Sequence, residues 1–172
     1  MPRFLGQEPW GSPSRRKVKI MRRSEREIKD PAEIAAILQA APVCRIAMSA
    51  GGRPYVVPVN FAVSGRYLYF HCSRRGKKID MLRDNPSVCF EADIPGDLRG
   101  ADTACSWGMK YQSVIGFGEA YFIEDGGEKK KALGILMKKY TGGDSLSYDD
   151  AILDKVLVIG VKIESMSGKK SD

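Results

Sequence analysis

The chain has 172 residues, 43% of them hydrophobic, and a formal net charge of +7. This length and composition are typical of one globular domain with a sizeable core. No apolar run approaches the roughly 18 residues of a membrane-spanning helix, and the basic N-terminus lacks the apolar centre of a signal peptide. We therefore expect a cytoplasmic protein without a membrane segment.

The positive charge is concentrated at the N-terminus. Residues 1–26 hold eight Lys or Arg residues and two Glu residues, so they contribute +6 of the net charge. A basic arm of this kind can bind nucleic acid, but the rest of the chain is nearly neutral and carries no recognition motif. We expect residues 1–20 to form a flexible basic extension and residues 21–172 to form a single domain, and we do not expect nucleic-acid binding.

The cysteine pattern argues against a structural metal. The four cysteines form no C-x-x-C pair, and the single histidine cannot complete a Cys/His zinc set. Three of the thiols lie in strand-like runs, where a buried cysteine behaves as a small hydrophobic residue. We expect free thiols at Cys44, Cys72, Cys89 and Cys105.

The first predicted element is a helix that begins near residue 31. Asp30 is a suitable N-cap, Pro31 suits the first helical position, and Glu33 occupies the capping-box position. Pro42 ends this helix. Turn residues then separate three predicted strands, which lie at residues 43–49, 55–63 and 67–72.

The second half of the chain continues the strand-rich pattern. Gly116 and Gly118 share one face of a long predicted strand, which indicates close approach of another group there. The predicted elements are helices at 76–84 and 128–140, strands at 88–92, 111–123 and 156–164, and a polar loop at 94–106. Six strands with peripheral helices predict an α+β, mainly β, barrel-like domain.

The segment Ser73-Arg74-Arg75-Gly76-Lys77-Lys78 carries the clearest chemical pattern. It precedes a predicted helix, whose free N–H groups and dipole attract a phosphate together with the side-chain cations. The alternative is a solvated basic turn. Pro58 lies inside a predicted strand and leaves a gap in its hydrogen-bond ladder, which a flat polar ligand can use. Together the two features indicate a flat, phosphorylated ligand on a β framework.

The order strand, turn, strand, SRRGKKIDMLRDNP, strand resembles the flavin-binding split barrel of the pyridoxamine 5′-phosphate oxidase superfamily. The segment QSVIGFGEA fits the family pattern Gln-x-x-x-x-Gly on the following long strand. Within the superfamily, RPYVVPVNF, CSWGMKYQSVIGFGEAYFIED, KALGILMKKYTG and IESMSGKK are most similar to the nitroimidazole-resistance (Nim-like) branch. The resemblance covers residues 21–170. It implies a six-stranded antiparallel Greek-key split β-barrel that binds FMN between the two subunits of a homodimer.

The resemblance also implies which residues contact the cofactor. The FMN phosphate would be held by Ser73, Arg74, Lys77 and Lys78. The isoalloxazine ring would lie along Pro58, Val59 and Asn60. Gln112 and Ser113 would approach the flavin from the long strand, either within one subunit or across the dimer interface.

The residues on the substrate side each have two possible roles. In the resembling branch a histidine at the place of His71 lies by the flavin, and histidine transfers protons near neutral pH. The alternative is a histidine that is hydrogen-bonded at the barrel rim. An apolar wall over the ring could be formed by Trp107, Met109 and Tyr111, although such side chains are more often plain core.

The resemblance implies an FMN-dependent oxidoreductase that reduces a small acceptor such as a nitroaromatic. Its electron donor would be NAD(P)H or a reductant protein. The alternative is a non-catalytic binding or carrier protein for flavin, the deazaflavin F420 or haem, for which His71 would be the one histidine axial ligand. Residues that would bind the phosphate of pyridoxamine phosphate are not evident, so oxidation of vitamin B6 is not expected.

Overall fold

A computed structural model describes residues 21–143 and 147–171, so the expected extension at residues 1–20 lies outside the described part. The helical elements are η1 (Ser24–Arg26), α1 (Pro31–Ala40), α2 (Lys77–Asp84), η2 (Ala104–Ser106), α3 (Gly126–Thr141) and α4 (Asp150–Leu153). The strands are β1 (Glu27–Ile28), β2 (Cys44–Ala50), β3 (Arg53–Val59), β4 (Ala62–Ser64), β5 (Tyr67–Ser73), β6 (Ser87–Arg99), β7 (Gly108–Ile123) and β8 (Val156–Ser171). Within the described residues, no helix is long and apolar enough to cross a bilayer.

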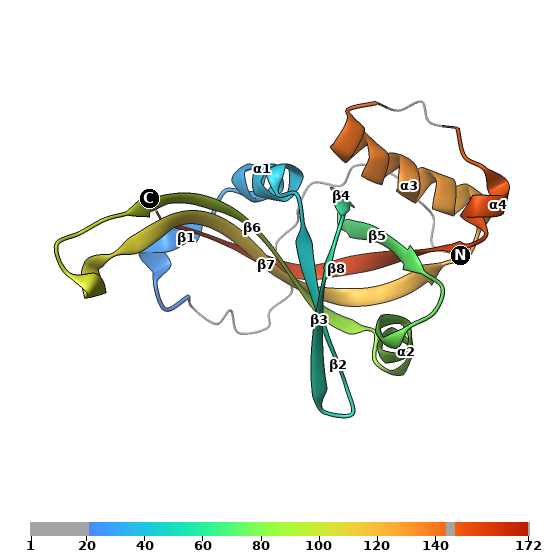
Figure 1. Ribbon diagram of the computed structural model, residues 1–172, viewed down its shortest axis with the longest axis horizontal. Coiled ribbons are helices and arrows are strands. Elements are labelled where there is room, and N and C mark those ends of the chain that lie inside the picture. Colours follow the sequence, from blue (N-terminus) through green and yellow to red (C-terminus); the bar gives the residue numbers. More distant parts are fainter. Residues whose placement is uncertain (1–20, 144–146, 172) are drawn as a thin grey trace.

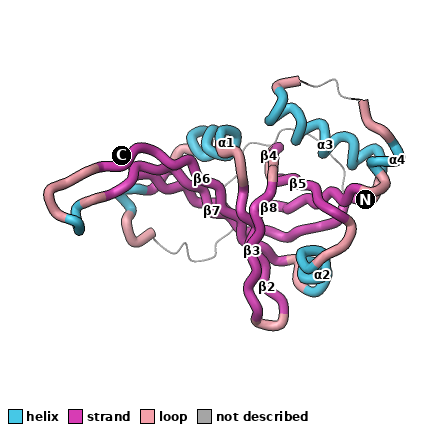
Figure 2. The backbone as a smooth tube through the Cα atoms, in the orientation of Figure 1, coloured by secondary structure: helices cyan, strands magenta, loops and turns pink. Residues whose placement is uncertain are grey.

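All eight strands belong to one antiparallel sheet with the order β3-β2-β6-β7-β8-β5-β4, and β1 pairs with β8 (Figures 1 and 2). The expected class, an α+β and mainly β split barrel, is confirmed. The expected number of six strands is wrong. Two residues of β1 add one strand, and the predicted strand 55–63 is two strands because its backbone leaves the sheet at Asn60 and Phe61.

The link between β3 and β4 forces the sheet to close. These strands lie at opposite ends of the sheet order, yet only Asn60 and Phe61 join them in the chain. The three residue steps from Val59 to Ala62 span at most about 11 Å, so the two ends of the sheet must come together. The sheet therefore curls into a barrel whose seam lies at Asn60–Phe61, which we call the closure segment.

The β6–β7 hairpin extends much further than the sequence predicts. The first part of the expected polar loop at 94–106 is strand as far as Arg99, because pairing continues through Leu98–Met109 and Arg99–Gly108 after a register shift. The result is a long arm with η2 at its tip (Figure 1). Most side chains from Pro95 to Arg99 are exposed, so this part of the strand lacks the apolar alternation by which a half-buried strand is recognised.

The helix ends follow the sequence signals. Asp30 caps α1 by accepting a hydrogen bond from the N–H of Ala32 at 2.9 Å. Asp125 caps α3 in the same way, and Gly142 ends that helix in the left-handed conformation with φ of 72°. Glu33 of the predicted capping box forms an ion pair of 2.7 Å with Lys170 of β8.

The apolar residues form two clusters on the two faces of β5. The larger one fills the barrel and includes the fully buried Phe61, Phe70 and Phe90. The smaller one lies between α3 and the outer face of the barrel, and it consists of Ala62, Tyr69, Ile123, Ala132, Leu136 and Val158. Helix α3 thus covers β4, β5 and part of β8 (Figure 1).

Two glycines of β7 allow the close packing that their sequence positions predict. A Cβ atom on Gly116 would lie 2.1 Å from the ring of Phe90, and one on Gly118 would lie 2.3 Å from the carbonyl oxygen of Lys162. The register of β7 against β8 also shifts between Phe117 and Gly118. These positions therefore have no room for any side chain.

We predict that Gly116→Ala lowers the free energy of unfolding by about 3 kcal/mol, the upper end of typical overpacking effects. The fully buried Phe90 ring cannot move aside without disturbing the barrel core. Gly126→Ala is the matched control, because a Cβ there meets nothing within 4 Å. Chemical denaturation measures the free energy of unfolding of both variants. Equal stability of the two variants would contradict the packing described here.

Candidate functional site

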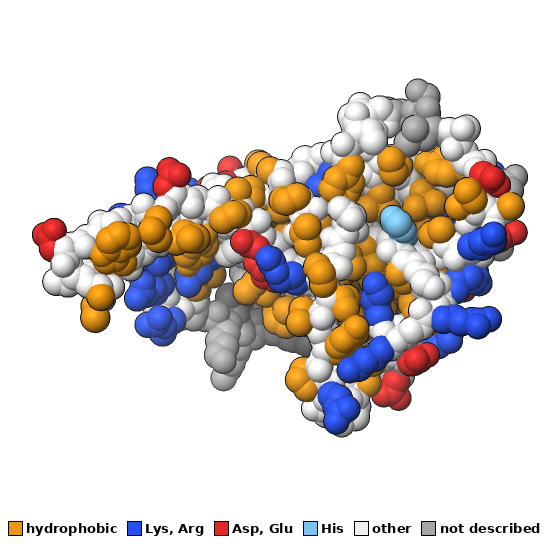
Figure 3. Space-filling model, in the orientation of Figure 1, with side chains coloured by type: hydrophobic (Ala, Val, Ile, Leu, Met, Phe, Trp, Pro, Cys, Tyr) orange, Lys and Arg blue, Asp and Glu red, His pale blue; other side chains and the backbone are white. Residues whose placement is uncertain are grey.

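A groove opens where β5 ends and α2 begins. It has a volume of about 230 Å³. We call it the α2 groove, and its lining comprises Tyr55, Val57, Cys72, Ser73, Arg75, Gly76, Lys77, Lys78 and Ile79. Thus the first turn of α2 forms one side, and two residues of β3 form another. Figure 3 shows Lys and Arg side chains gathered over this part of the molecule.

The entry to α2 is built to receive an anion. Gly76 adopts φ of 127°, a conformation that other residues rarely adopt, and it has no side chain with which to cap the helix. The first N–H groups of α2, those of Lys77 and Lys78, have no acceptor within the helix. Both lysine ammonium groups lie over aromatic rings, Lys77 Nζ at 4.4 Å from the centre of Tyr55 and Lys78 Nζ at 5.5 Å from that of Phe70.

The structure separates the two arginines of the cationic segment. The guanidinium of Arg74 donates to the carboxylate of Glu124 at 3.3 Å and to the carbonyl of Asp154 at 3.2 Å. Arg75 lines the α2 groove instead. The hydroxyl oxygen of Ser73 accepts a hydrogen bond of 3.5 Å from the N–H of Arg75. Of the four expected phosphate residues, Ser73, Lys77 and Lys78 line the groove and Arg74 does not.

The proline-containing strand β3 is an edge of the sheet. The register of the β2–β3 hairpin puts Pro54 and Pro58 at positions whose backbone faces the free edge rather than β2. The missing backbone hydrogen bonds that Pro58 predicts therefore lie on the free edge of β3, where no neighbouring strand is paired. The side chain of Val59 is buried in the core and its backbone pairs with Cys44 of β2, whereas Asn60 is exposed. From Val57 in the groove to Asn60 the strand advances about 10 Å.

The other expected cofactor residues lie elsewhere in the same chain. Gln112 and Ser113 are half-buried on β7, and β6 and β2 stand between β7 and β3 in the sheet. Three strand spacings of about 4.8 Å separate them from β3. Trp107 and Met109 are exposed on the β6–β7 arm, away from α2 (Figure 1), and Tyr111 is half-buried. Within one chain, none of these five residues reaches the α2 groove.

His71 is exposed on β5, opposite Val158 of β8. As expected, it shares a face of the strand with Tyr67 and Tyr69. That face carries α3, and successive side chains of a strand point to opposite faces. His71 therefore lies on the other side of β5 from Cys72, which lines the α2 groove.

Sequence reasoning missed several residues of the groove. Tyr55 and Val57 follow from the alternation of β3, since they share the inward face with Val59. Cys72 alternates in the same way on β5. Burial raises the pKa of the Cys72 thiol, and the nearby Lys78 ammonium partly opposes that rise. Among the described residues, no group of three or more His, Cys, Asp or Glu could hold a metal ion.

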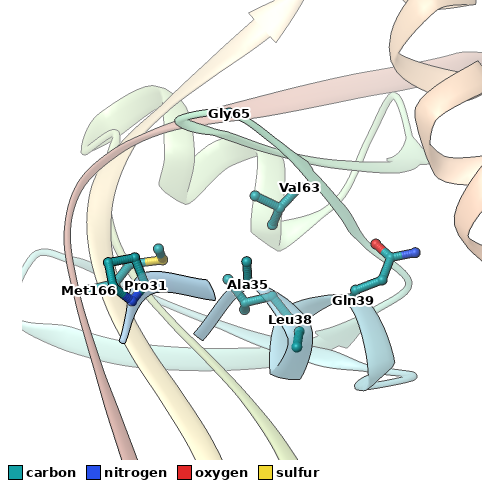
Figure 4. Close-up of a pocket in the computed structure, with 8 residues that line it drawn as sticks. Pro31, Ala35, Leu38, Gln39, Val63, Gly65 and Met166 are labelled. Atoms are coloured by element: carbon teal, nitrogen blue, oxygen red, sulfur yellow. The ribbon is translucent and has the colours of Figure 1, made fainter. Parts of the chain in front are cut away.

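A larger hollow of about 390 Å³ lies on another side of the molecule, between α1, the β4–β5 turn and β8 (Figure 4). Its lining contains no charged side chain and comprises Pro31, Ala35, Ala36, Leu38, Gln39, Val63, Gly65 and Met166. A phosphate would lose its hydration there without gaining a cation, and the start of α1 beside it has proline at its first position and is already capped by Asp30. The smaller α2 groove is therefore the better candidate for a phosphorylated ligand.

The comparisons with known proteins agree on one family. The sequence model of the pyridoxamine 5′-phosphate oxidase family matches residues 30–170. A crystal structure of a proposed 5-nitroimidazole antibiotic resistance protein from Bacteroides thetaiotaomicron is 36% identical, covers 84% of this chain and 86% of that one, and superposes with a TM-score of 0.75. An FAD-binding protein from Mesorhizobium loti is 26% identical, with coverage of 86% and 98% and a TM-score of 0.64.

A curated relative, an uncharacterized protein of Rhizobium meliloti, is 37% identical over 59 residues. That stretch is 34% of this chain and 38% of the relative, so it adds a local sequence match only. The family match and the first structure, by contrast, each span most of the chain. The chain belongs to the pyridoxamine 5′-phosphate oxidase family.

Proposed function

We propose that this protein binds FMN and uses it to reduce a small acceptor such as a nitroaromatic compound. The observation that carries the proposal is the α2 groove, in which two lysines and the open start of a helix lie beside the free edge of β3. The similarity to a proposed 5-nitroimidazole resistance protein supports the nitroaromatic class of acceptor.

The residues of the groove suit the terminal phosphate of FMN. A phosphate monoester near neutral pH carries up to two negative charges, and Lys77 and Lys78 supply two cations and two free N–H groups. The isoalloxazine ring would extend from Tyr55 and Val57 toward Pro58 and Asn60. The flat ring would use the outward-facing backbone groups of this edge.

The flavin would supply the electron transfer, and the protein would supply binding, orientation and exclusion of water. NAD(P)H or a reductant protein would provide the electrons. We also propose that the protein works in the cytoplasm. Its four cysteines are free thiols, and free thiols persist in reducing compartments.

We predict that replacing both Lys77 and Lys78 with Ala weakens FMN binding by roughly 2–5 kcal/mol, because two charge-assisted contacts to the phosphate are lost. Titration of the apoprotein with FMN, followed by flavin fluorescence, measures this loss. The control removes two adjacent, exposed cations that do not line the groove, Lys130 and Lys131 on α3, and should leave the affinity unchanged. FAD titrated in parallel should bind more weakly than FMN. Equal FMN affinity in both double variants would contradict the assignment of Lys77 and Lys78 to the phosphate site.

We further propose a homodimer. Exposed apolar residues follow the outer face of the sheet, where the register aligns Phe117 of β7 with Cys89 of β6, Ala47 of β2 and Val56 of β3. Phe117 is 53% exposed and Val56 is 59% exposed. Contiguous apolar surface of this kind is typical of an interface, and two-fold pairing of one surface is the commonest assembly. A partner subunit could then bring Gln112 and Ser113 to the flavin.

Phe117→Glu is predicted to convert the dimer into a monomer, because each subunit would bury a charge without a partner in the interface. Ile152→Glu is the matched control, since Ile152 is also exposed but lies on α4, away from this face. Light scattering measures the mass of each variant. A wild-type protein that is monomeric with FMN bound would contradict the proposal.

His71 is the candidate proton donor of this function. Its ring is exposed, and it faces away from the α2 groove of its own chain. It would therefore serve a substrate that approaches from the α3 side of β5, or a flavin held against that side in the dimer. The competing role is that of a rim residue without a part in the reaction.

If His71 donates a proton, His71→Ala and His71→Gln should both lower turnover per bound flavin by about 10²-fold. FMN affinity should survive both changes, because His71 does not line the groove. Anaerobic assays with a nitroaromatic acceptor, normalised to flavin content, measure the turnover. Unchanged rates per flavin would identify His71 as a rim residue. Wild-type protein that binds FMN but reduces no acceptor would support the carrier alternative.

A further inference from the structure

The closure segment is held by a side chain rather than by a neighbouring strand. Strand pairing of β3 ends at Val59, and pairing of β4 begins at Ala62. Between them, the backbone N–H of Phe61 donates to the hydroxyl of Tyr140 on α3 at 2.9 Å. The same hydroxyl donates to the carbonyl of Pro42 at 2.8 Å. Tyr140 therefore ties the closure segment to the segment that leads into β2.

The neighbouring Lys139 makes a second connection at the same place. Its Nζ lies 3.4 Å from the centre of the Phe61 ring. It also donates to the carbonyls of Leu38 and Ala41, both at 2.8 Å, at the C-terminal end of α1. A cation there satisfies carbonyls that the helix leaves without partners and complements the helix dipole. Through these two side chains the end of α3 contacts both the end of α1 and the closure segment.

These contacts determine where Asn60 lies. Asn60 is flanked by a strand end on one side and by Phe61 on the other. The Phe61 side chain is fully buried in the core, and its N–H is bound to Tyr140. With both neighbours fixed, the backbone of Asn60 has little freedom. Its side chain, in contrast, remains exposed.

We propose that Tyr140 and Lys139 are positioning residues for the flavin ring. They hold the closure segment so that Asn60 and the end of β3 present a fixed edge to the isoalloxazine. The inference rests on the proposed function, which places the ring along Pro58, Val59 and Asn60. It gives a role to the KKYTG sequence of α3, none of whose residues lines the α2 groove.

Lys139 is a partly buried cation against the ring of Phe61. Burial lowers its pKa to about 8, while the two carbonyls and the face of Phe61 favour its charged form. A methionine of similar length keeps the packing of the lysine stem and gives up the two contacts to carbonyls, a loss that is smaller than the stability of a typical domain. We therefore expect Lys139→Met to fold. Lys131→Met, on the exposed face of the same helix, is its control.

The test is a double-mutant cycle between Tyr140→Phe and Asn60→Ala, with FMN affinity as the readout. Tyr140→Phe should weaken FMN binding by about 3- to 10-fold, the range expected for one hydrogen bond. In the Asn60→Ala background the same change should have an effect of less than about twofold, because Tyr140 acts through Asn60. The visible circular dichroism of flavin-saturated protein should also change in Tyr140→Phe and in Lys139→Met.

Tyr121→Phe is the matched control for the tyrosine. Tyr121 packs edge-on against Tyr67 and is hydrogen-bonded to Tyr69 between α3 and the sheet, so it also loses a hydroxyl contact beneath α3. It should alter stability without altering the flavin spectrum or affinity. Two results would overturn this inference and leave the proposed function standing. The first is wild-type FMN affinity and a wild-type flavin spectrum in both Tyr140→Phe and Lys139→Met. The second is an undiminished effect of Tyr140→Phe on FMN affinity in the Asn60→Ala background. A wild-type protein that does not bind FMN would overturn both.

Discussion

The structure depends on the closure of one sheet by two residues. Because β3 and β4 lie at opposite ends of the strand order and are joined only by Asn60 and Phe61, the sheet has to bend around a single core. The fully buried side chain of Phe61 fills that core at the seam. The seam leaves β3 with one unpaired edge, and this edge is where a ligand can meet backbone groups without competing with a strand.

The same closure brings the chemistry of distant segments together. Helix α2 packs against β2, and the Asn85 side chain donates to the carbonyl of Ser49 at 2.9 Å. The start of α2 therefore lies beside the inward face of β3, where Lys77 meets Tyr55. A phosphate site and a free strand edge become parts of one surface, although about 20 residues separate Tyr55 from the cationic turn. The proposed ligand contacts both the phosphate site and the free strand edge, and the end of α3 holds the strand edge in position.

Much of this arrangement could be predicted from the sequence, and the exceptions have physical reasons. The caps at Asp30 and Gly142 and the tight packing at Gly116 are local signals, so they were predictable. The arm could not be predicted, because an exposed hairpin lacks the apolar alternation of a core strand. The ion pair of Arg74 with Glu124 and the contact of Tyr140 with Phe61 join residues far apart in sequence. A single sequence gives no sign of such contacts.

The central claim is that a flavin phosphate binds at the start of α2 and the ring lies along the end of β3. A crystal structure of the protein with FMN tests it most directly. The account predicts that the phosphate contacts the N–H groups and side chains of Lys77 and Lys78, with the isoalloxazine edge along Pro58, Val59 and Asn60. A phosphate bound away from the α2 groove, or a ring in the hollow between α1 and the β4–β5 turn, would contradict it.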